Sequence, residues 1–114
     1  MNTNKTAEFT QSISKKKNSL NTYRLPITII NKSSVGFMKA EVAVKDEGSS
    51  RSGDETVVTV YFGHIPVGES STEYANLPGG IEFVIYKIQP DLGDEIYGFG
   101  AADNAAGADI TITD

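Results

Sequence analysis

The sequence predicts an all-β fold, a single antiparallel β-sandwich of about seven strands. From position 24 onward, short runs rich in β-branched and aromatic residues alternate with clusters of Gly, Pro, Ser and Asp, which is typical of sandwiches. No stretch repeats its apolar residues with a helical period, and 114 residues is the length of one domain. The chain has no Cys and no Trp, so it lacks the disulfide and buried Trp of antibody domains. An Ig-like sandwich without a disulfide is the first expectation, and a jelly roll or C2-like sandwich the second.

The first three strands are predicted at 25–30, 36–45 and 55–62. Pro26 lacks a backbone N–H, so the first strand is expected near a sheet edge. The second and third strands alternate apolar and polar residues, as expected when one face is in the core and the other in water. The residues expected to face the core are Met38, Ala40, Val42, Val44, Val58, Val60 and Phe62.

Four further strands are predicted at 71–76, 80–88, 94–100 and 108–113. Between the first two of these, Leu77-Pro78-Gly79-Gly80 predicts a hairpin with a type II turn, because Pro78 fixes φ and Gly79 accepts a positive φ. The segment 102–109 is expected to hold one helical turn at most. In the last strand, Ala108, Ile110 and Ile112 are expected to share one face.

The stretch from Thr72 to Gly80, TEYANLPGG, followed by alternating β-formers, resembles a segment of bacterial secreted Ig-like modules. In those modules a small hydroxyl residue, a Tyr, an apolar residue and a Gly turn precede a strand. The resemblance implies an Ig-like fold rather than a particular activity.

Charge is unevenly distributed along the chain. Residues 1–24 hold five basic residues and one Glu, a balance of +4, so a chain of net charge −5 leaves −9 for the remaining residues. We expect 1–23 to be a flexible basic arm ahead of a sandwich domain at 24–114, with Lys15, Lys16 and Lys17 as the residues that would tether it to an acidic partner. The acidic domain makes nucleic acid an unlikely partner, because phosphate binding requires cationic side chains.

Neither a membrane-spanning run nor a secretory signal is visible in the sequence. We therefore expect a protein of the cytoplasm or of a particle, or of a cell surface if a signal has been removed. Asn4-Lys5-Thr6 and Asn31-Lys32-Ser33 fit the N-glycosylation pattern, which arises often by chance.

The residue types needed for catalysis are sparse. His64 is the one imidazole, and no Ser lies in a G-x-S-x-G elbow. The Gly-rich stretch 98–107 lacks the Lys of a phosphate-binding loop. A domain of this size rarely provides the cleft that a glycosidase needs, so the sequence predicts that the protein is not an enzyme.

Calcium is the one cofactor that the sequence suggests. Acidic residues fall in three predicted connections, and connections at one end of a sandwich can converge to supply the oxygen ligands that calcium prefers. Solvated surface charge explains the same residues. The candidate ligands are Asp46, Glu47, Asp54, Asp91, Asp94, Glu95, Asp103 and Asp109.

Tyr61, Tyr86 and Tyr97 would form a binding surface if they shared the outer face of one sheet, although tyrosines that are simply half-buried on a sheet are the more common case. The runs PITII (26–30) and DITIT (109–113) are candidate edge strands open to strand addition. The leading hypothesis is a non-catalytic module that presents a sheet face and loop tips to a protein partner or to copies of itself. The alternative is a calcium-dependent, C2-like module that binds lipid or glycan.

Overall fold

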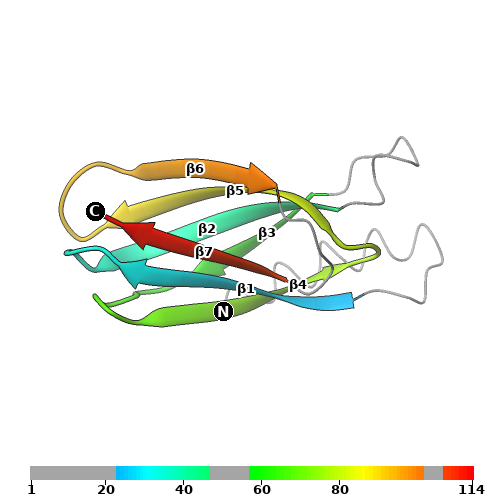
Figure 1. Cartoon of the computed structure of the whole chain (residues 1–114), viewed down its shortest axis with the longest axis horizontal. Coiled ribbons are helices and arrows are strands. Elements are labelled where there is room, and N and C mark those ends of the chain that lie inside the picture. Colours follow the sequence, from blue (N-terminus) through cyan, green and yellow to red (C-terminus); the bar gives the residue numbers. More distant parts are fainter. Residues whose placement is uncertain (1–22, 47–56, 102–106) are drawn as a thin grey trace.

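The computed structural model describes residues 23–46, 57–101 and 107–114, which form two β-sheets packed face to face (Figure 1). No helix occurs within these ranges. The expected basic arm lies outside them except for Tyr23, which begins the first strand. Of the segment 102–109, expected to hold one helical turn at most, residues 102–106 also lie outside the described ranges. The strands are β1 (Tyr23–Lys32), β2 (Phe37–Asp46), β3 (Val57–Phe62), β4 (Ser70–Leu77), β5 (Ile81–Pro90), β6 (Ile96–Ala101) and β7 (Ala108–Thr113).

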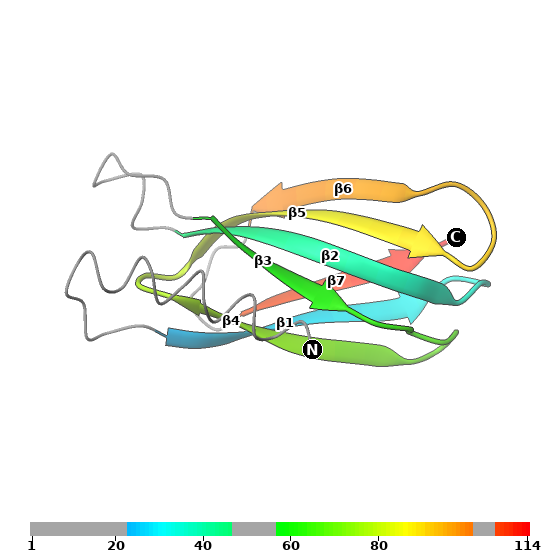
Figure 2. The ribbon, with the colours of Figure 1, turned by 180° about the vertical axis from the view of Figure 1, so that it is seen from behind.

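The prediction of a seven-stranded sandwich is confirmed. One sheet has the order β4-β1-β7 and the other β3-β2-β5-β6, and the four-stranded sheet lies in front in Figure 2. Neighbouring strands are antiparallel except β1 and β7, which run parallel. The expectation of a purely antiparallel fold was therefore wrong at one pair. Parallel neighbours require a long connection, and here the five other strands lie between them in the chain.

The core is built by alternation, as expected. Every second residue of β2 from Ala40 and of β3 from Val58 is buried. Met38 is an exception, because the β2–β5 register shifts between Phe37 and Lys39. This irregularity buries Phe37 and leaves Met38 51% exposed. The core residues are Leu25, Ile27, Ile29, Phe37, Ala40, Val42, Val44, Val58, Val60, Phe62, Ile65, Ala75, Leu77, Ile81, Val84, Ile88, Ile110 and Ile112.

β1 is the central strand of its sheet, so the expectation that Pro26 marks an edge was wrong. Pro26 is tolerated because the pairing with β7 begins one residue later, at Ile27 and Ala108. Gly107, with a φ of +127°, brings the chain against Pro26 at this point. A Cβ at Gly107 would collide with the carbonyl oxygen of Pro26, so the close approach requires glycine.

The corner after β4 carries the chain from one sheet to the other. β4 pairs with β1 and β5 with β2 and β6, so the predicted hairpin was wrong. Gly79 is not among the described glycines with positive φ, and a type II turn was therefore also wrong. The corner is held instead by buried Asp46 at the end of β2, whose Oδ1 accepts a 2.7 Å hydrogen bond from the Gly79 N–H.

At the opposite end of the sandwich, Asn31 joins three segments. Its Nδ2 donates to the carbonyls of Val35 (3.0 Å) and Ile65 (3.1 Å), and its Oδ1 accepts from the Ser33 N–H (3.0 Å) and hydroxyl (2.7 Å). The side chain is fully buried, so Asn31 cannot carry a glycan in the folded protein. This network fixes the β1–β2 connection against the loop before β4.

Candidate interaction surface

The outer face of the four-stranded sheet is the candidate interaction surface. Since inward residues of these strands form the core, the residues between them face outward, and the registers align them in rows. One row crosses the sheet as Tyr61, Glu41, Lys87 and Tyr97, in the order β3-β2-β5-β6. The next two rows are Thr59, Ala43, Ile85 and Phe99, then Val57, Lys45, Phe83 and Ala101.

The β5–β6 side of this face is apolar and exposed. Ile85 is 51% exposed, Tyr97 66% and Phe99 74%. Phe83 lies diagonally from Phe99, with ring centroids 5.7 Å apart and planes tilted by 30°, a geometry that aromatic pairs favour. We name Phe83, Ile85, Tyr97 and Phe99 the aromatic strip. Contiguous exposed apolar side chains of this kind mark interaction sites in soluble proteins.

Four charged side chains on the same face lie in two ion pairs. Lys87 Nζ lies 3.8 Å from Glu41 Oε2, and Lys45 Nζ lies 3.8 Å from Glu82 Oε1. All four side chains are 32–44% exposed, so each pair contributes little to folding stability. Their effect is electrostatic, because pairing leaves little net charge beside the aromatic strip of an acidic protein.

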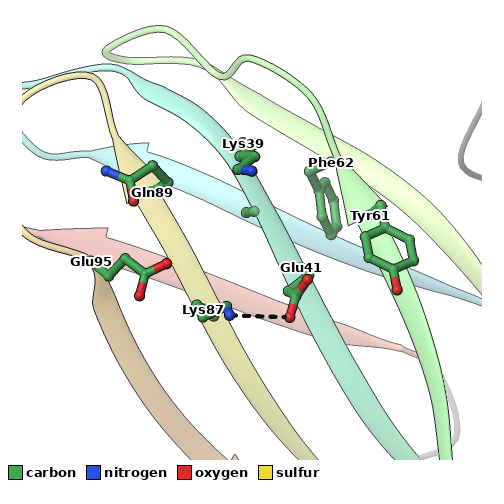
Figure 3. Close-up of a pocket in the computed structure, with 8 residues that line it drawn as sticks. Lys39, Glu41, Tyr61, Phe62, Lys87, Gln89 and Glu95 are labelled. Atoms are coloured by element: carbon green, nitrogen blue, oxygen red, sulfur yellow. Dashed lines mark ion pairs between the residues drawn. The ribbon is translucent and has the colours of Figure 1, made fainter.

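Two cavities interrupt the face. One, of about 220 Å³, lies beside the aromatic strip and is lined by Ala43, Lys45, Val57, Phe83 and Ile85. The other, of about 260 Å³, is more polar (Figure 3). The close-up shows the Lys87–Glu41 pair spanning β5 and β2 within it. It is lined by Lys39, Ala40, Glu41, Tyr61, Phe62, Lys87, Gln89 and Glu95.

The three tyrosines expected to share this face do not all do so. Tyr61 and Tyr97 lie on it, in the same row. Tyr86 aligns with Val42 and faces inward, where it packs against the core. Its ring occupies the space that a Cβ at Gly98 would need. The Tyr97 hydroxyl donates to Glu95, and this hydrogen bond raises the pKa of Tyr97.

The carboxylates considered as calcium ligands are spread over the molecule. Asp46 is buried at one end of the four-stranded sheet, whereas Asp91, Asp94 and Glu95 lie in the β5–β6 connection at the other end. Asp109 lies within β7, opposite Thr28. Across 23–46, 57–101 and 107–114, no three Asp, Glu or His side chains gather closely enough to hold a metal ion. The remaining candidates, Glu47, Asp54 and Asp103, lie outside the described residues.

His64 lies in the β3–β4 connection and is largely exposed. Its Nε2 is 3.4 Å from Asp91 Oδ2, which is long for a hydrogen bond. The contact links the β3–β4 and β5–β6 connections at one end of the sandwich. In this structure His64 therefore contributes to a contact between two loops, through Asp91.

Ile85 and Phe99 were not singled out as site residues from the sequence. The signal was present in β5, where Phe83, Val84 and Ile85 place apolar residues on both faces of one strand. A strand with one wet face should instead alternate with polar residues. Three consecutive apolar residues in a strand with one wet face therefore predict apolar side chains on the outer face as well as in the core.

Comparison with protein-family models, curated proteins and solved structures finds no match for this chain. In the part of the chain that the structure describes, no helix is long and apolar enough to cross a membrane.

Proposed function

We propose that this protein is a non-catalytic interaction module that binds a protein partner through the outer face of its four-stranded sheet. The observation that carries the proposal is the aromatic strip, with Ile85, Tyr97 and Phe99 at least half exposed. Folding does not require these side chains outside the core, and their exposure to water is unfavourable. A partner that covers them would recover that free energy.

The composition of the face suits a protein interface. Interface centres are rich in aromatic residues and poor in unpaired charge, with a polar rim. Here the aromatic strip would form the centre, and Lys39, Gln89 and Glu95 lie at the end of the face nearest the β5–β6 connection. The exposed loop tip at Leu92, 75% accessible, would extend the contact.

The strand neighbours support an Ig-like module. If β1, β2, β4, β5 and β6 correspond to strands B, C, E, F and G, then B lies beside E, and C, F and G follow in order, as in Ig domains. β3 then takes the place of C′ beside C, as in variable-type domains. The departure is β7, which occupies the place of strand A but comes last in the chain.

The test is capture of a partner by the immobilised chain from an extract of its source cells, compared with variants of matched charge. Ile85→Lys places a charge in the aromatic strip, whereas Thr111→Lys places the same charge at an exposed position of the other sheet. We expect the Ile85 variant to lose at least tenfold in affinity for the purified partner and the Thr111 variant to bind normally.

A partner bound equally by both variants would contradict the proposal. The calcium-dependent alternative is separated by repeating the titration with calcium and with chelator. An apolar sheet contact is unaffected by chelator, whereas binding through acidic loops requires the ion.

A further inference from the structure

The edges of the two sheets are not equally protected against pairing with another strand. β3 and β4 pack against each other where the two sheets meet on one side. On β4, Glu73 aligns with buried Ile27 and faces inward, and burial raises the pKa of its carboxyl. On β7, Asp109 is exposed. Inward or edge charges of this kind oppose strand addition.

Among the described residues, β6 has no such protection. The strand Ile96–Ala101 contains no charged residue and no Pro, and it lies at the outer margin of the described molecule in both views (Figures 1 and 2). Gly98 and Gly100 present no side chain to an approaching backbone, and a Cβ at Gly100 would meet no atom within 4 Å. An uncharged, unpaired edge is a template for another strand.

The sequence of β6 is complementary to itself. Read in opposite directions about Gly98, the residues Ile-Tyr-Gly-Phe-Gly pair Tyr97 with Phe99 twice and Gly98 with itself. In antiparallel strands, directly opposite residues point to the same face. Both aromatic pairs would therefore lie on the outer face, where Tyr97 and Phe99 are already exposed.

We propose that two copies of the chain pair antiparallel through β6, about a two-fold axis at Gly98. The pair would join two four-stranded sheets into one continuous sheet, with two Tyr97–Phe99 contacts at its centre. A two-fold interface uses the same patch on both copies, which is what the symmetry of this strand provides. Each chain has a net charge of −5, but β6 contains no charged residue. Two copies can therefore pair through β6 without placing like charges opposite each other within the strand.

This inference goes beyond the proposed function, because it concerns the edge of β6 and not the binding of another protein to the sheet face. It would double the width of that face. The two proposals can fail separately, since Ile85 lies one strand away from the β6 edge.

The first experiment is sedimentation equilibrium of the full chain from about 1 µM to about 1 mM. We expect the mass to rise with concentration from the 12.2 kDa of one chain to twice that value. Phe99→Lys removes both aromatic pairs and places a charge on the edge, so we expect dimerisation to weaken about tenfold or more. Thr111→Lys, with the same added charge on the other sheet, should leave the dimerisation constant within about twofold of the original value.

The second experiment tests the pairing register by disulfide cross-linking. The chain has no Cys, so any disulfide must form between the introduced residues. With the axis at Gly98, Ile96 of one copy lies opposite Gly100 of the other, within the separation a disulfide spans. We expect Ile96→Cys and Gly100→Cys chains to cross-link under oxidation when mixed. Each alone should not cross-link, because identical positions in the two copies are about 14 Å apart.

Three results would overturn the proposal. They are a mass of one chain at every concentration, a dimer that Phe99→Lys weakens no more than Thr111→Lys does, and a dimer in which the mixed cysteine chains fail to cross-link. None of these bears on capture of another protein, which depends on Ile85.

Discussion

Asn31 should be the most sensitive polar residue in the described fold, and replacing it with Asp tests why. Asn31→Asp conserves shape and keeps an acceptor for the Ser33 N–H and hydroxyl. It removes both donors, however, and places a carboxylate oxygen about 3 Å from the carbonyl oxygens of Val35 and Ile65. The site is fully buried, so the new charge would have neither water nor a cation beside it.

The expected cost follows from these contacts. Two lost hydrogen bonds contribute about 1 kcal/mol each, and an uncompensated buried charge costs about 3–5 kcal/mol. The two figures overlap, and we expect the variant to be destabilised by about 3–5 kcal/mol at pH 7. Asn31→Ala should cost about 2–4 kcal/mol. It removes four hydrogen bonds, but the Ile65 carbonyl keeps the Phe37 N–H and the Val35 carbonyl keeps the Ser33 hydroxyl.

The two variants should differ in their pH dependence, which urea denaturation at pH 7 and pH 4.5 would measure. The carbonyls raise the pKa of the new carboxyl in the folded state above the unfolded value of about 3.9. The destabilisation caused by the charge is therefore fully present above the pKa that the new carboxyl has in the folded state. It diminishes as the pH falls from that pKa towards about 3.9. Relative to the original protein, Asn31→Asp should recover stability at pH 4.5, and Asn31→Ala should not. A penalty below about 1 kcal/mol, or one that is equal at both pH values, would refute this account of the site.

Two further substitutions test the corner between the sheets and a contact within the four-stranded sheet. Asp46→Ala removes the acceptor of the Gly79 N–H and should destabilise the fold by about 1–3 kcal/mol in urea denaturation; a loss within about 0.5 kcal/mol would show that the corner holds without it. Gly98→Ala places a Cβ on the Tyr86 ring and should cost about 1–3 kcal/mol in thermal denaturation. Gly100→Ala, in open space on the same strand, is the control and should be near neutral, so equal losses in both would contradict the role of Tyr86.

The number and position of the strands could be predicted from the sequence because alternation is a local signal. Val58, Val60 and Phe62 are buried as the period of two requires, and Ile110 and Ile112 are buried in the last strand. Local periodicity says nothing about which strands become neighbours. The period of two therefore does not encode that the corner at 77–80 crosses from one sheet to the other. Nor does it encode that β7 pairs parallel to β1.

The predictions that Pro26 marks an edge strand and that Tyr86 faces outward were wrong, each for its own structural reason. Pro26 indicated an edge because a central strand needs its N–H groups, but β7 stops one residue short of it. Tyr86 was grouped with Tyr61 and Tyr97 by residue type, whereas its phase in β5 turns it inward over Gly98. For Pro26 the deciding contact comes from a strand distant in the sequence, whereas for Tyr86 it is the phase of its own strand that decides.

The two outer faces of this sandwich differ, and the difference bears on function. On the three-stranded sheet the outward residues include Thr28, Thr72 and Thr111, and the aromatic ring of Tyr74 is covered by the Arg24 guanidinium at 3.9 Å. On the four-stranded sheet, Phe99 remains 74% exposed.

Both faces are equally remote from the core, so core packing requires neither composition. A face selected only for solubility would carry polar residues, as the three-stranded sheet does. The aromatic strip instead leaves apolar area in water, which makes the isolated molecule more prone to association. That cost is reduced when another surface covers the strip. We therefore interpret the strip as one half of the proposed interface. Pairing through β6 would place two such strips side by side in one sheet and leave both open to a protein partner.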